Sequence, residues 1–163
     1  MDVRFAGDPA VREHVLTELL YPVRDTVLDK AKLRPGDTVL DVGAGDGLIA
    51  FGALERLGPS GQVIFSDISQ DLLDHCRAAA AEEGLLDRCR FVLASADSLT
   101  DMADASVDVV TTRSVLIYVK DKAAALREFL PRAQTGRADQ RVRADQRADA
   151  RSWPALRLRH HPG

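Results

Sequence analysis

Long hydrophobic runs, cysteines and aromatic residues are scarce in this chain of 163 residues. No apolar run reaches the roughly 18 residues of a membrane-spanning helix, and residues 1–5 do not resemble a signal peptide. Cys76 and Cys89 match no metal-ligand spacing, so we expect two reduced thiols, no metal site and a cytoplasmic location. Aromatic residues make up 5% of the chain against 45% hydrophobic residues, which predicts an aliphatic core typical of α/β proteins.

Lysine is absent after Lys122, and the charge balance changes near the same place. Residues 1–130 carry 14 Lys and Arg against 22 Asp and Glu, whereas residues 131–163 carry 8 Arg against 3 Asp. The segment 137–141 recurs at 143–147, and Val142 is the only large apolar residue in 131–152. We therefore expect residues 131–163 to be a low-complexity, disordered tail without a strand.

Residues 1–35 predict an N-terminal helical segment. Asp8-Pro9 is a good helix start, and apolar residues then repeat at helical spacing. We expect an interruption at Tyr21-Pro22, a second helix, and a stop at Pro35-Gly36.

Residues 36–130 alternate between apolar runs and amphipathic segments. Expected strands cover 38–42, 62–66, 90–94 and 107–112, and expected helices cover 48–57, 69–84 and 121–130. This alternation predicts an α/β fold with a Rossmann-like, doubly wound parallel sheet of four strands.

The strongest motif is the segment Asp41 to Gly47, which follows the first strand and precedes a helix. Its glycines allow a tight turn and a close approach of the backbone to a ligand. A dinucleotide fingerprint would place its third glycine at position 48, which is Leu48. The carboxylate of Asp41 also favours a cationic ligand over a pyrophosphate.

Residues 39–47 resemble motif I of the class I S-adenosylmethionine-dependent methyltransferases. The resemblance extends over about residues 10–130 and implies S-adenosylmethionine as cofactor. It implies that Asp67, beside Ile68, binds the ribose hydroxyls, that Ala96-Asp97 recognises adenine, and that Arg113 lies in the loop beside the methionine part. The cofactor-binding residues it implies are Asp41, Gly43, Ala44, Gly45, Gly47, Asp67, Ile68, Ala96, Asp97 and Arg113.

Each of these residues also has a purely structural interpretation. The glycines can serve the turn alone, Asp67 can cap a helix, and Asp97 and Arg113 can be ordinary surface residues. Tyr21 is either a packing residue or a lid contact to the cofactor or substrate. No residue is identified as a catalytic base.

The segment 114–121 resembles the small-molecule branch of the family, including quinone- and arsenite-type enzymes, which implies a small-molecule methyl acceptor. Family members continue with a Pro-Gly-Gly-like turn and three more strands, whereas this chain continues with Arg-Ala-Asp repeats. Our hypothesis is a frameshift in a GC-rich reading frame; divergence or a functional basic tail is the alternative.

Three functions stay open from the sequence. The first is methyl transfer to a small molecule, and the second is a truncated remnant that at most binds the cofactor. The third is nucleic-acid binding through the Arg-rich tail, against which the three acids of that tail argue.

Overall fold

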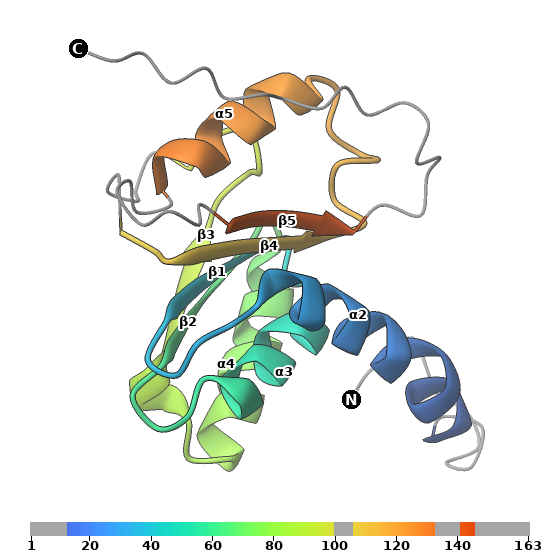
Figure 1. The fold of residues 1–163 in the computed structure, drawn as a ribbon, viewed down its shortest axis with the longest axis vertical. Coiled ribbons are helices and arrows are strands. Elements are labelled where there is room, and N and C mark those ends of the chain that lie inside the picture. The colour runs from blue at the N-terminus through green and yellow to red at the C-terminus, as the bar shows by residue number, and fades with distance from the viewer. Residues whose placement is uncertain (1–12, 100–105, 133–140, 146–163) are drawn as a thin grey trace.

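A parallel sheet of five strands organises the protein, and the computed structural model describes residues 13–99, 106–132 and 141–145. The strand order is β3-β2-β1-β4-β5, with every neighbouring pair parallel (Figure 1). The strands are β1 (Thr38–Val42), β2 (Gln62–Asp67), β3 (Cys89–Leu93), β4 (Val109–Arg113) and β5 (Arg141–Asp145). The predicted Rossmann-like sheet is confirmed, and each of the four expected apolar runs forms a strand.

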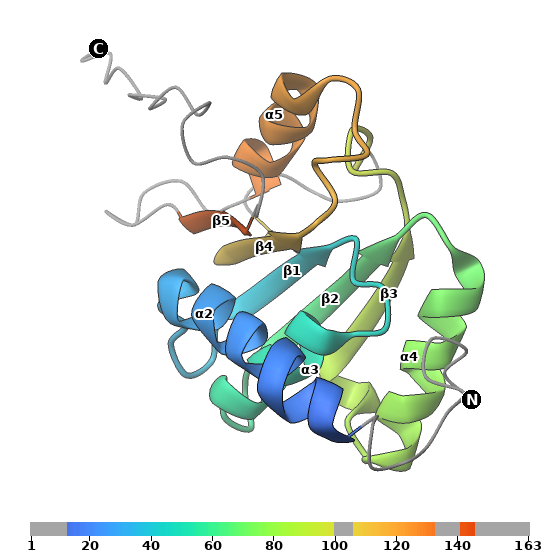
Figure 2. The same ribbon diagram turned by 90° about the vertical axis from the view of Figure 1, so that its right-hand side faces the viewer.

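Helices cover both faces of the sheet. One face of the sheet is covered by three helices, α2 (Tyr21–Ala31), α3 (Leu48–Arg56) and α4 (Gln70–Glu82) (Figures 1 and 2). The other face is covered by α5 (Lys122–Arg132). Two apolar clusters result, one around Phe65 beneath α2, α3 and α4, and one around Phe129 beneath α5. In the described ranges, no helix has the length and apolar character needed to cross a membrane.

The interruption expected at Tyr21-Pro22 is wrong. Residues 13–31 form one continuous helical segment, in which Leu16–Leu20 is a π-helical turn that runs directly into α2. Pro22 comes just after this π-helical turn, where the regular i→i−4 hydrogen-bond pattern is already interrupted, so its missing N–H is tolerated. The helix ends at Ala31, followed by Lys32 with φ of 50°. The expected start at Asp8-Pro9 lies outside the described residues.

Three strands end at the same level of the sheet. Val42 is in register with Ser66 on one side and with Thr112 on the other. The next residues along the chain, Gly43, Asp67 and Arg113, therefore lie side by side at this edge of the sheet. Because the chain places β2 and β3 on one side of β1 and β4 on the other, this edge is a topological switch point, where α/β proteins bind ligands.

The fifth strand corrects the expectation that no strand follows β4. Residues 141–145 pair in parallel with β4, with Val109 opposite Arg141 and Arg113 opposite Asp145. Strand pairing uses backbone N–H and C=O groups, so an open edge accepts a segment whose composition does not suggest a strand. The rest of the segment expected to be disordered, 133–140 and 146–163, lies outside the described residues.

Candidate functional site

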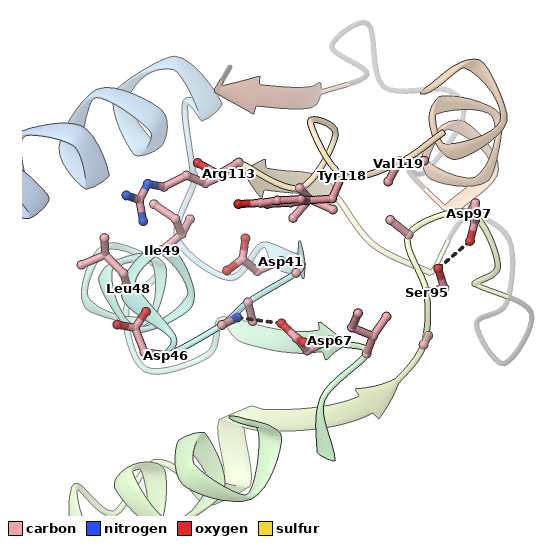
Figure 3. Close-up of a pocket in the computed structure, with 18 of the residues that line it drawn as sticks. Asp41, Asp46, Leu48, Ile49, Asp67, Ser95, Asp97, Arg113, Tyr118 and Val119 are labelled. Carbon is pink, nitrogen blue, oxygen red and sulfur yellow. Dashed lines mark hydrogen bonds between the residues drawn. The ribbon is translucent and has the colours of Figure 1, made fainter. Parts of the chain in front are cut away.

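A pocket of about 510 Å³ opens at the carboxyl ends of the strands (Figure 3). This volume is within the usual range for small-molecule and cofactor sites. The pocket is lined by Asp41, Gly43, Ala44, Gly45, Asp46, Leu48, Ile49, Asp67, Ile68, Ala94, Ser95, Ala96, Asp97, Arg113, Ser114, Val115, Tyr118, Val119 and Lys120.

The glycine loop after β1 forms the floor of the pocket. The backbone N–H groups of Gly43 and Ala44 both donate to the carbonyl of Ser66, at 2.7 and 2.9 Å, which ties the loop to the end of β2. Gly43 has φ of 68° and Gly45 has φ of 58°, conformations that residues with a Cβ rarely adopt. An added Cβ at Gly43 would overlap the side chain of Val115, whereas nothing lies within 4 Å of a Cβ at Gly45. Gly43 thus allows the loop after β4 to pack directly on the glycine loop.

Asp67 connects the glycine loop with the start of α4. Its Oδ2 accepts a hydrogen bond from the N–H of Gly45 at 2.9 Å, and its Oδ1 accepts one from the N–H of Ser69 at 3.0 Å (Figure 3). Each carboxylate oxygen has about two lone pairs, so one acceptor position on each oxygen stays available to a ligand. Two adjacent hydroxyl groups match that pair of acceptors.

Asp41 is a buried carboxyl beneath the pocket, with 2% of its surface exposed. Its Oδ1 accepts a hydrogen bond from the hydroxyl of Thr111 at 2.8 Å, across β1 and β4. Burial raises the pKa of Asp41 to about 7, and the charge of Asp67 adds to the rise, whereas the Thr111 hydrogen bond and Arg113 lower it. A positively charged ligand in the pocket would therefore stabilise the ionised form.

The opposite wall comes from the end of β4 and the turn after it. Arg113, the last residue of β4, is half-buried and lines the pocket. Ser114 has φ of 59°, a strained value for a residue with a side chain. Tyr118 extends over the pocket with 83% of its surface exposed (Figure 3).

The far end of the pocket is the loop after β3. Ser95 donates to Asp97 at 2.5 Å, and the N–H of Ser98 donates to the carbonyl of Ser95 at 3.0 Å. Ala96 is buried and Asp97 is exposed, and both line the pocket together with Ile68, whose surface is 75% exposed. Apolar side chains and a carboxylate are thus available to a ligand at this end of the pocket.

The structure brings together nine of the ten residues expected to bind the cofactor. Gly47 is the exception, because it is buried, caps α3 with φ of 83°, and leaves no room for a Cβ beside Phe51 and Cys76. Tyr21 also lies outside the pocket lining; the guanidinium of Arg24 lies 4.5 Å from the centre of its ring.

Several lining residues were not predicted, chiefly Leu48 and Ile49 in the first turn of α3 and Tyr118 after β4. Leu48 and Ile49 directly follow the glycine loop in the sequence, so their contact with the pocket could have been predicted from that position. Tyr118 carries no such signal, because its place over the pocket depends on how the turn packs.

Comparison with known proteins identifies the family to which this chain is similar. Residues 39–136 match the family described as a methyltransferase domain. The ubiquinone/menaquinone biosynthesis C-methyltransferase UbiE of Xanthomonas oryzae pv. oryzae is 40% identical over 99 residues, which cover 61% of this chain and 39% of the relative. The chain thus spans about two fifths of the length of this curated relative.

Solved structures share the fold. Geranyl diphosphate C-methyltransferase from Streptomyces coelicolor A3(2), crystallised with S-adenosyl-L-homocysteine, superimposes with a TM-score of 0.69 at 21% identity, covering 80% of this chain and 48% of that one. The [4+2]-cyclase SpnF superimposes with a TM-score of 0.64 at 27% identity, covering 71% of this chain and 41% of that one.

Proposed function

We propose that this chain, which belongs to the methyltransferase domain family, binds S-adenosylmethionine in the pocket and transfers its methyl group to a small molecule. The observation that carries the proposal is the carboxylate of Asp67. It lies beside a glycine loop at the switch point of the sheet, with one acceptor position left on each oxygen.

The pocket fits S-adenosylmethionine in shape and charge. Gly45 leaves open space where a Cβ would stand, so a ligand can approach the backbone closely. Asp41 and Asp67 supply negative charge, which suits a ligand with a sulfonium and an ammonium group and disfavours a pyrophosphate.

Each wall is assigned to a part of the ligand. Asp67 accepts hydrogen bonds from the ribose hydroxyls, while Ile68, Ala96 and Asp97 hold the adenine. Arg113, half-buried in the pocket wall, binds the methionine carboxylate.

The chemistry needs little from the protein beyond orientation. Bound S-adenosylmethionine supplies a methyl group on a positively charged sulfur, which is already an activated electrophile. The pocket holds the acceptor in line and excludes water. Asp41 is not assigned as a base, because it is buried and its Oδ1 accepts the Thr111 hydrogen bond. The two free cysteines support a reducing compartment, the cytoplasm, as the location.

Calorimetry with S-adenosylmethionine tests the assignment of Asp67. The Asp67→Asn variant loses the charge and keeps one of the two oxygens that accept from the N–H groups of Gly45 and Ser69. Asp87→Asn, on an exposed turn before β3, is the matched control. Hydrogen bonds to a charged acceptor are worth about 1.5–3 kcal/mol, so we expect a loss of roughly 10- to 150-fold in affinity for Asp67→Asn alone. Equal affinities of the two folded variants would refute the assignment.

A second candidate is use of the same pocket for a reaction other than methyl transfer. The 27% identity to the [4+2]-cyclase SpnF favours it. Measurement of S-adenosylhomocysteine release with candidate acceptors separates the two, because only methyl transfer consumes the cofactor.

A further inference from the structure

We propose that the ring of Tyr118 binds the positively charged sulfur of S-adenosylmethionine, so that this residue distinguishes the cofactor from its demethylated product. The inference rests on the proposed function. Tyr118 lies over the pocket in a position that the sequence did not indicate.

Tyr118 is exposed on a turn that is itself firmly anchored. Leu116 is fully buried in the cluster beneath α5, and Val115 packs against Gly43. The N–H of Tyr118 donates to the carbonyl of Val115 at 2.9 Å, which closes the turn. The turn therefore presents a large aromatic ring, 83% exposed, in a fixed place. An exposed aromatic residue on a fixed support at a pocket is expected to contact a ligand.

The ring forms the wall of the pocket that faces the carboxylates. Figure 3 shows it nearly edge-on across the pocket, with Asp41 and Asp67 on the opposite side and its hydroxyl directed toward the end where Arg113 lies. One face of the ring is thus turned toward the space above the two acids.

That space suits a cation. An aromatic face attracts positive charge through its quadrupole, and a carboxylate attracts it directly. Among the described lining residues, four are acidic and two are basic. The two bases are Arg113, the last residue of β4, and Lys120 in the segment after it, whereas Asp41 and Asp67 lie in the strands β1 and β2. A sulfonium between the ring and these two carboxylates would be attracted from both sides.

The test compares two ligands that differ in this charge. S-adenosylmethionine and S-adenosylhomocysteine share the adenosyl and amino-acid parts, but only the first carries the methyl group and the positive sulfur. Their dissociation constants are measured by calorimetry on the full chain and on Tyr118→Leu, Tyr118→Phe and Tyr21→Leu. Tyr21 is the matched control, because it is the other tyrosine of the chain and lies outside the pocket lining.

We expect Tyr118→Leu to weaken S-adenosylmethionine roughly 3- to 30-fold, the range of a cation–π interaction, and S-adenosylhomocysteine less than about twofold. Tyr118→Phe keeps the ring and should retain both affinities, and Tyr21→Leu should change neither. Equal losses for the two ligands would overturn the proposal, because the ring would then be simple packing. So would unchanged affinities, which would make Tyr118 a contact to the methyl acceptor.

The proposed function fails in a different way. If the unmodified chain, folded by circular dichroism, binds neither ligand, then the proposed cofactor site is wrong and this inference falls with it. If both ligands bind and Asp67→Asn weakens both alike, the proposed cofactor site is supported. The affinities of the Tyr118 variants then decide whether this further inference holds.

Discussion

The hydroxyl of Thr111 in β4 donates a hydrogen bond to Asp41 in β1 at 2.8 Å, and both side chains are buried beneath the pocket. The hydrogen bond compensates only part of the cost of burying a carboxylate, because burial still raises the pKa of Asp41 to about 7. The protein thus holds a carboxyl that is costly to ionise directly beneath a site that suits a cation.

The stability of the free protein should therefore fall as the pH rises. Asp41 has its ordinary pKa, near 3.8, in the unfolded chain and a pKa of about 7 in the folded protein, so the folded state binds the proton more tightly. Its contribution to stability is full below about pH 4 and is lost as the pH rises through 7. We expect the unfolding free energy, relative to Asp41→Asn, to fall by about 2–4 kcal/mol between pH 5 and pH 8. Urea unfolding of both proteins at each pH measures this difference, and a constant difference would refute it.

Substitution of Gly43 by alanine should be more costly than substitution of Gly45. Both have positive φ, but only an alanine at Gly43 would also overlap Val115. We expect a destabilisation of about 1–2 kcal/mol for Gly45→Ala and about 2–4 kcal/mol for Gly43→Ala, by urea unfolding. In the double variant Gly43→Ala with Val115→Ala, part of the loss should return. If the double variant loses the sum of the two single losses, the overlap is not the cause.

Arg88 should be a strong stabilising residue outside the site. Its guanidinium donates to the carbonyls of Leu54, Gly58 and Gly61 at 2.9, 2.6 and 3.0 Å, which satisfies the end of α3 and the turn before β2. We expect Arg88→Ala to lower the unfolding free energy by about 2–4 kcal/mol, because three partly buried acceptors lose their partner. Arg90→Ala, on an exposed position of β3, is the control and should change it by less than about 0.5 kcal/mol.

Removal of β5 should destabilise the sheet. A chain ending at residue 132 lacks the strand that pairs with β4, whereas a chain ending at residue 145 keeps it. We expect a melting temperature at least about 5 °C lower for the shorter chain, and more aggregation through the open edge of β4. Thermal melts and light scattering compare the two, and identical behaviour would show that β5 adds nothing to stability.

The fold up to β4 could be predicted because β1, β2 and β4 are mostly buried and therefore appear as apolar runs, as in Thr38–Val42, while β3 carries a shorter apolar run. β5 could not, because its pairing with β4 depends on backbone groups and on the neighbouring edge rather than on its own composition. The other edge strand, β3, has the apolar run at residues 91–93 as a signal, whereas Val142 is the only large apolar residue of β5.

The candidate site also contains residues that the sequence could predict and residues that it could not. Asp67 could be predicted because parallel strands end at one level, so an acid at the end of β2 must lie near the loop after β1. Gly47 was assigned to the ligand from the motif alone; in the structure it lies outside the pocket lining, at the N-cap of α3. Tyr118 depends on the packing of Val115 and Leu116, which no local pattern records.

The pairing of β5 with β4 has a consequence for the length of the chain at this edge. Arg143, Ala144 and Asp145 stand opposite Thr111, Thr112 and Arg113, and the same three residue types recur six positions earlier in the sequence. A slip by six, an even number, returns each position to the same face of the sheet. In a chain that gained a further six-residue copy, the Arg, Ala and Asp of that copy would therefore have the same alternation along an edge strand as Arg143, Ala144 and Asp145.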